Sequence, residues 1–176
     1  MRTARPVFLL VLLALVIVTG GCSSSPGARA WAASVCTALA PWRSEIGTLA
    51  NRTQQQMTAE TTPAQAKENL TRLFGGAQEA SERAREGVAR AGVPDVKHGK
   101  QIAAGFTTSL GAIRDAYGRA KDGVQALPTA PSKQFYAQVE TVVARLNADY
   151  QRSQLDTSSL DSEELKDAFD EVPECR

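Results

Sequence analysis

Apolar residues recur at steps of three and four along most of the chain, and this periodicity constrains the fold more than any other feature. The first series consists of Val35, Leu39, Trp42, Ile46 and Leu49. Residues at these steps share one face of an α-helix, whereas a half-buried strand would alternate apolar and polar residues. Further series are Leu70, Leu73, Phe74, Ala77, Ala80, Ala84 and Val88; Ile102, Phe106, Leu110, Ile113, Tyr117, Ala120, Val124 and Leu127; and Phe135, Val139, Val142, Leu146 and Tyr150. The sequence therefore predicts an all-α protein.

Capping and turn residues divide these series into four long helices. Thr62 and Gln65 have the spacing of a capping box around Pro63, which favours a helix start there. Pro94 follows the second series and predicts its end, and Ser132 is the expected N-cap of the fourth helix.

The sequence does not decide whether the first helix is continuous. Pro41 lies inside its apolar series, and a proline there removes a backbone hydrogen bond. We therefore expect the helix either to kink or to split at Pro41. The polar run at residues 51–62 interrupts the apolar pattern and is expected to form a solvated connection.

The C-terminal segment predicts a short acidic helix. Asp161 and Glu164 have capping-box spacing, and Leu165 and Phe169 would face inward. Four long helices with short connections pack most simply as an up-down-up-down four-helix bundle. The expected fold is this bundle with the short C-terminal helix added.

The N-terminus has the three parts of a secretory signal, which are a basic region, an apolar region and a cleavage zone of small residues. Arg2 and Arg5 precede the apolar residues 7–18, a stretch too short for a hydrocarbon core that needs about 20 apolar residues. Thr19, Gly20, Gly21 and Cys22 follow and resemble the lipobox of bacterial lipoproteins, although Thr19 stands where leucine is usual. The alternatives are an ordinary secretory signal with an incidental Cys22 thiol, or an uncleaved anchor.

The lipobox resemblance implies a domain organisation and a location. Residues 1–21 would be a lipoprotein signal peptide, and Cys22 would carry a diacylglyceryl group. Residues 22–29 would be the lipidated cysteine and a flexible tether, and residues 30–176 the helical bundle domain. We expect the protein on the extracytoplasmic face of the plasma membrane, where two or more acyl chains give stable attachment.

If Cys22 carries lipid, two cysteines remain, and a pair of cysteines in an exported chain predicts a disulfide. Cys36 lies near the start of the first helix, and Cys175 lies close to the chain end. Four antiparallel helices would return the end of the fourth to the start of the first. The helix count and the cysteine pairing therefore support each other, and we expect a disulfide between Cys36 and Cys175 to close the bundle.

Charge and residue types give little sign of chemistry. The 20 basic residues balance 19 acidic ones, and nucleic-acid binding favours a clustered basic excess. His98 is the single histidine, with no cysteine or carboxylate at metal-ligand spacing beside it. The acidic tail lacks the glycine of a calcium loop. We expect no catalytic residue, no metal, no cofactor and no nucleic-acid partner.

Small residues concentrate in the later halves of the second and third helices. They are Ala77, Ala80, Ala84 and Gly87 in the second, and Ala116, Ala120 and Gly123 in the third. Large residues of neighbouring helices would face them. Close packing of large against small accounts for this pattern, and an apolar ligand pocket between the helices is the alternative.

The segment "VCTALAPW", with a cysteine near the C-terminus, resembles small, alanine-rich helical lipoproteins of actinobacterial cell envelopes. This resemblance implies a lipid anchor with the domain outside the membrane. The leading hypothesis is a non-enzymatic interaction module for an envelope protein or the cell wall. A carrier of an apolar small molecule is the second hypothesis, and an enzyme is the third.

Overall fold

The computed structural model describes residues 25–153 and 160–176, and every regular element in these ranges is helical. The elements are α1 (Ala28–Gln56), α2 (Pro63–Arg90), α3 (Gly99–Ala126), α4 (Ser132–Ser153), α5 (Glu163–Glu171) and the short 3-10 helix η2 (Pro173–Cys175). The all-α prediction is confirmed for this part of the chain. None of the described helices combines the length and the apolar character needed to cross a membrane.

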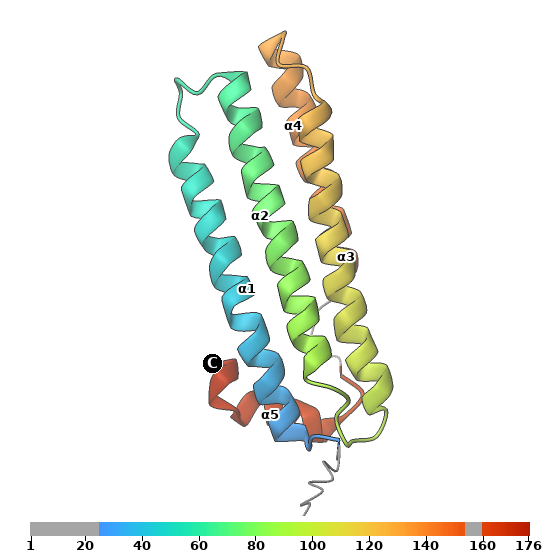
Figure 1. Cartoon of the computed structure of the whole chain (residues 1–176). Helices are drawn as coiled ribbons and strands as arrows, with labels where there is room; N and C mark the ends of the chain where they lie inside the picture. Colours follow the sequence, from blue (N-terminus) through green and yellow to red (C-terminus); the bar gives the residue numbers. More distant parts are fainter. Residues whose placement is uncertain (1–24, 154–159) are drawn as a thin grey trace, which may run out of the picture.

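Three long helices lie side by side, with α2 between α1 and α3 (Figure 1). α4 packs mainly against α3 and touches α2. No Cα atom of α4 lies within 8 Å of a Cα atom of α1, so these two helices do not close a ring. α5 and η2 pack instead against α1, near the end where α1 begins.

The core is divided into two clusters along the long helices. The cluster near the start of α1 combines Trp31, Val35, Leu39 and Trp42 with Ala80, Ala84, Val88, Ile102, Phe106, Leu110, Ile113, Leu165, Ala168, Phe169 and Val172. The other cluster combines Leu70, Phe74, Ala116, Ala120, Val124 and Leu146. α5 thus completes the core at one end of the molecule, and α4 completes it at the other.

Three aromatic rings join α5 to the long helices. The ring of Trp31 meets the edges of Phe106 at 5.4 Å and Phe169 at 6.0 Å between ring centroids, and Phe106 stacks on Phe169 at 5.8 Å. We call these residues the aromatic trio. Both Phe169 and Leu165 are buried, which confirms the predicted inner face of α5.

Of the expected N-caps, Thr62 is confirmed, whereas Ser132 is the first residue of α4 and the carbonyl oxygen of Pro131 before it accepts the first helical hydrogen bonds. Thr62 and Gln65 form the predicted capping box at the start of α2. The expected cap at Asp161 is wrong, because Ser162 caps α5 and its hydroxyl accepts a bond from the Leu165 amide at 3.3 Å. Serine and aspartate are equally good N-caps, so the sequence alone did not decide between these adjacent residues.

The structure also decides the two expectations for α1. The helix is continuous from Ala28 to Gln56 through Pro41, so it is not split there. The polar run was expected to be a connection from residue 51 onward, but its first six residues are helical. Glutamine and arginine are good helix formers despite their polarity, and the connection is confined to residues 57–62.

Candidate functional site

The predicted disulfide between Cys36 and Cys175 is present, with a Cα–Cα distance of 5.0 Å. Cys36 is buried in α1 and Cys175 belongs to η2, so the bond fixes the end of the chain to the first helix. Residues 1–21, the expected signal peptide, and Cys22 lie outside the described residues. Lipidation of Cys22 therefore stays a prediction.

His98 lies at the surface immediately before α3. Its backbone is left-handed (φ 60°), and its Nε2 atom lies 3.7 Å from an Asp161 carboxylate oxygen. Within residues 25–153 and 160–176, no group of three or more His, Cys, Asp or Glu side chains is placed to hold a metal ion. This arrangement is that of a surface side chain with one acidic neighbour.

The small residues of α2 pack closely against α1. Ala80 and Ala84 belong to the same buried cluster as Trp42. A Cβ atom built on Gly87 would lie 2.8 Å from the Cβ atom of Ala38, closer than real Cβ contacts allow. Close packing therefore explains this half of the small-residue pattern, as predicted.

The small residues of α3 have a different environment. Ala116, Ala120 and Gly123 line a groove of about 300 Å³ between α3 and α4, together with Val142 and Leu146. We call this the α3–α4 groove. Its apolar floor matches the alternative prediction of a space between the helices.

Charged groups border the α3–α4 groove. Arg119 Nη2 donates to Asp149 Oδ2 at 2.8 Å, and this bond lowers the pKa of Asp149. Asp122 and Arg145 also lie at the edge. Apolar and charged groups together suit an amphiphilic or apolar small molecule.

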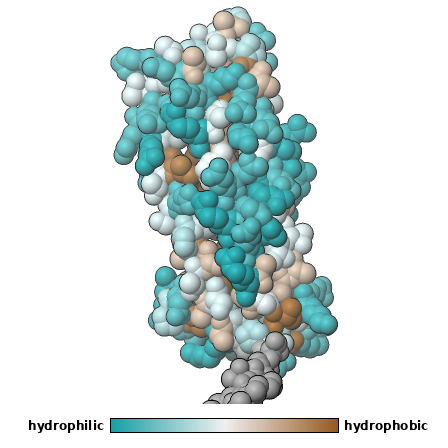
Figure 2. Space-filling view, viewed as in Figure 1, coloured by the Kyte–Doolittle hydropathy of each residue, from teal (hydrophilic) through white to brown (hydrophobic). Residues whose placement is uncertain are grey.

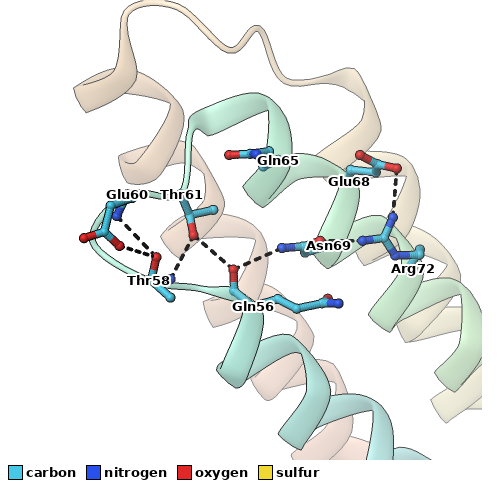
Figure 3. Close-up of a pocket in the computed structure, with 8 residues that line it drawn as sticks. All are labelled: Gln56, Thr58, Glu60, Thr61, Gln65, Glu68, Asn69 and Arg72. Atoms are coloured by element: carbon cyan, nitrogen blue, oxygen red, sulfur yellow. Dashed lines mark hydrogen bonds and ion pairs between the residues drawn. The ribbon is translucent and has the colours of Figure 1, made fainter.

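A second and larger hollow lies where α1 ends and α2 begins (Figure 3). Its volume is about 470 Å³, and its lining residues are Gln56, Thr58, Glu60, Thr61, Gln65, Glu68, Asn69 and Arg72. We call it the distal hollow, because Gln56 in its lining is the last residue of α1, at the opposite end of this helix from Ala28. All of its lining side chains are polar.

Hydrogen bonds hold the turn that forms one wall of the distal hollow. The Thr61 hydroxyl donates to the carbonyl oxygen of Gln56 at 3.0 Å and accepts from the Thr58 amide at 2.8 Å (Figure 3). From α4, the Tyr136 hydroxyl donates to the Thr61 carbonyl oxygen at 3.1 Å. The turn is thereby tied to two helices.

The charged side chains of the distal hollow are already engaged. Arg72 Nη1 donates to Glu68 Oε1 at 2.8 Å, and a second Arg72 nitrogen donates to Asn69 Oδ1. The Thr58 hydroxyl donates to Glu60 at 2.7 Å, which lowers the pKa of Glu60.

The amide groups of the distal hollow are less fully used. Asn69 is only 7% exposed, and its Nδ2 atom lies 3.4 Å from the carbonyl oxygen of Gln56. Among the described residues, neither the side-chain amide of Gln56 nor Nε2 of Gln65 has a hydrogen-bond partner. The amide donors of this hollow are therefore only partly engaged in hydrogen bonds within the protein.

Sequence reasoning did not find the distal hollow. Half of its lining residues fall in the polar run 51–62, which the sequence pattern predicts to be a solvated connection, and the other half lie in the first turns of α2. The one available signal was the capping box of Thr62 and Gln65, which fixes the start of α2 beside the end of α1.

No protein family, curated protein or solved structure matches this chain.

Proposed function

We propose that this protein is a lipid-anchored extracytoplasmic lipoprotein whose helical domain is a non-enzymatic binding module of the cell envelope. The lipobox-like residues before Cys22 support the anchor. The pairing of the other two cysteines supports export, because disulfides persist in oxidising compartments. We also propose that the four long helices run up-down-up-down, as their short connections favour.

The position of the distal hollow is the observation that carries this proposal. The 29 residues of α1 correspond to a helix of about 43 Å. Ala28, six residues after Cys22, begins α1 at one end of this length, and Gln56 of the distal hollow ends α1 at the other. An anchor at Cys22 would therefore leave the hollow facing away from the bilayer.

The surface between the two ends is also suited to an aqueous envelope. The face formed by α1, α2 and α3 is mostly hydrophilic, with a few small hydrophobic patches (Figure 2). Exposed ion pairs such as that of Arg83 with Glu45, at 2.7 Å, link neighbouring helices on their outer sides.

Cross-linking in intact cells tests the proposal. A photoreactive amino acid at Thr58 should capture an envelope protein or cell-wall material, because Thr58 lies at the distal end. The same substitution at Lys97, near the anchored end, provides the matched control. Identical products in a Cys22→Ser background would contradict a role for the anchor, and the absence of any Thr58 product would contradict the proposed envelope-binding module.

The α3–α4 groove favours a second candidate function, a carrier of an apolar small molecule. Its test is native mass spectrometry of the protein isolated from the cells that make it. A bound molecule should be lost in Ala120→Leu, whose larger side chain would fill the groove, and kept in the control Ala144→Leu on the exposed side of α4. Equal retention by both variants would contradict the carrier function.

A further inference from the structure

The distal hollow offers hydrogen-bond donors and acceptors in nearly equal measure. It contains the three side-chain amides of Gln56, Gln65 and Asn69, the two hydroxyls of Thr58 and Thr61, the two carboxylates of Glu60 and Glu68, and the guanidinium of Arg72. Specific recognition in such a site depends on matching many polar groups of a ligand at once.

The charges of the hollow argue against a charged ligand. An anion would meet two carboxylates, while the single guanidinium is already bound to Glu68 and Asn69. A cation would compete with Arg72 for Glu68 and with the Thr58 hydroxyl for Glu60. Both carboxylates are exposed to water, where an ion pair contributes little. A neutral ligand avoids both penalties.

Asn69 contributes a buried amide group at the base of the hollow. Its side chain is more than nine-tenths buried, yet its Nδ2 atom has only the contact of 3.4 Å, which is longer than the usual 2.7–3.2 Å of such bonds. A ligand hydroxyl could therefore replace the Gln56 carbonyl oxygen as the acceptor with a gain in geometry. The side-chain amides of Gln56 and Gln65 present a donor next to an acceptor.

An amide or carboxylate group matches two hydroxyls on adjacent carbon atoms, because each of its two polar atoms can bind one of them. The volume of about 470 Å³ lies in the range of about 300–1,000 Å³ that is usual for small-molecule sites. Tyr136 is 41% exposed and bonded to Thr61, so it offers an apolar ring next to the same turn.

We propose that the distal hollow binds a neutral saccharide, either a free oligosaccharide or a segment of an envelope polysaccharide. This inference rests on the proposed envelope function and names the ligand class of its distal site. Asn69 would bind a sugar hydroxyl at the floor, and Gln56 and Gln65 would bind hydroxyls at the rim. The ring of Tyr136 would pack against the C–H groups of a neighbouring sugar unit.

Binding of defined neutral sugars by the complete protein, purified from membranes in detergent, tests this inference. The probes are maltotriose, mannotriose and N,N′-diacetylchitobiose, each measured by saturation-transfer NMR and calorimetry. We expect at least one to bind, with an affinity that does not fall as the salt concentration rises, because no net charge is neutralised. An insoluble cell-wall polysaccharide, added as a competitor, distinguishes a polymer segment from a free sugar.

The chain offers a closely matched pair of variants. Gln56→Ala removes an exposed rim amide, and Gln55→Ala removes the same group from the adjacent position outside the hollow. Loss of one or two hydrogen bonds should raise the Kd of Gln56→Ala by about three- to tenfold. Gln55→Ala should bind as the wild type does.

Three results would overturn the inference. They are no binding of any of the three sugars, equal binding by the two variants, or salt-sensitive binding of a charged peptide at the hollow instead. If the Thr58 cross-linker still captured an envelope protein while no sugar bound, the proposed function would stand and the saccharide would be refuted. If sugar binding occurred and cross-linking gave no product, the site would be confirmed and the anchored module would be refuted.

Discussion

Loss of the disulfide between Cys36 and Cys175 should lower the free energy of unfolding by about 5 kcal/mol. The bonded residues are separated by 139 positions, so the bond closes a loop that contains most of the helical domain. In the chain-entropy model, the bond stabilises the fold because it restricts the unfolded chain, and the effect grows with the logarithm of loop length. Domains of this kind have net stabilities of about 5–15 kcal/mol, so the loss would be a large fraction of the total.

Urea unfolding followed by circular dichroism measures this effect. The double variant Cys36→Ala/Cys175→Ala is compared with the wild type and with Cys22→Ser, which keeps the pair. For a urea dependence of about 1–3 kcal/mol per molar, the midpoint should fall by about 2–5 M. The Cys22→Ser variant should unfold at the wild-type midpoint.

A reducing agent supplies an independent measurement of the same bond. It should shift the wild type to the midpoint of the double variant, and it should leave the double variant unchanged. A midpoint change equivalent to less than about 1 kcal/mol would refute the loop-closure reasoning. In that case the packing of η2 and α5 on α1 would restrict the chain end without the bond.

Two further predictions concern the ion pairs and the core. Hydrogen bonds from Arg85 and Arg114 lower the pKa of Glu82 from 4.5 to about 2, so the stabilisation by this carboxylate is complete above about pH 4.5 and is lost as the pH falls toward 2. The difference in unfolding free energy between wild type and Glu82→Gln should therefore shrink across this interval, and a difference that stayed constant from pH 7 to 2 would contradict the assignment. Removing one ring of the aromatic trio with Phe169→Ala should lower the unfolding free energy by about 3–5 kcal/mol in urea titrations. The exposed control Asp170→Ala should change it little, and equal effects of the two variants would show that α5 is not held by its buried face.

The helices could be predicted because each of the long ones has a continuous apolar face. Helix ends were less accessible to sequence reasoning. The polar residues 51–56 extend α1, since glutamine favours a helix whether or not it is buried. The sequence pattern also could not predict that α1 and α4 do not pack against each other. An amphipathic face shows that a helix is buried on one side, but it does not show which other helix covers that side.

The two candidate sites differ in how much of each could be predicted from the sequence. Ala116, Ala120 and Gly123 were recognised as small residues on a core face, and they line the α3–α4 groove. The distal hollow gave no comparable signal, because its amides and hydroxyls are ordinary surface residues. It exists because α1 extends as far as Gln56, which brings the carbonyl group of that residue to Asn69 of α2.

The two ends of the molecule are stabilised in different ways, and this difference favours the distal end for binding. Around the start of α1, the disulfide, the aromatic trio and a hydrogen bond from the Asp95 amide to the Pro26 carbonyl oxygen at 2.8 Å hold the chain next to the expected anchor. The distal turn is held by exposed hydrogen bonds of Thr61 and Tyr136. Exposed hydrogen bonds can exchange for bonds to a ligand at small net cost, whereas a buried aromatic cluster and a covalent bond cannot. If the chain is anchored through Cys22 as proposed, the exchangeable polar groups of the distal hollow would lie where an envelope ligand could meet them.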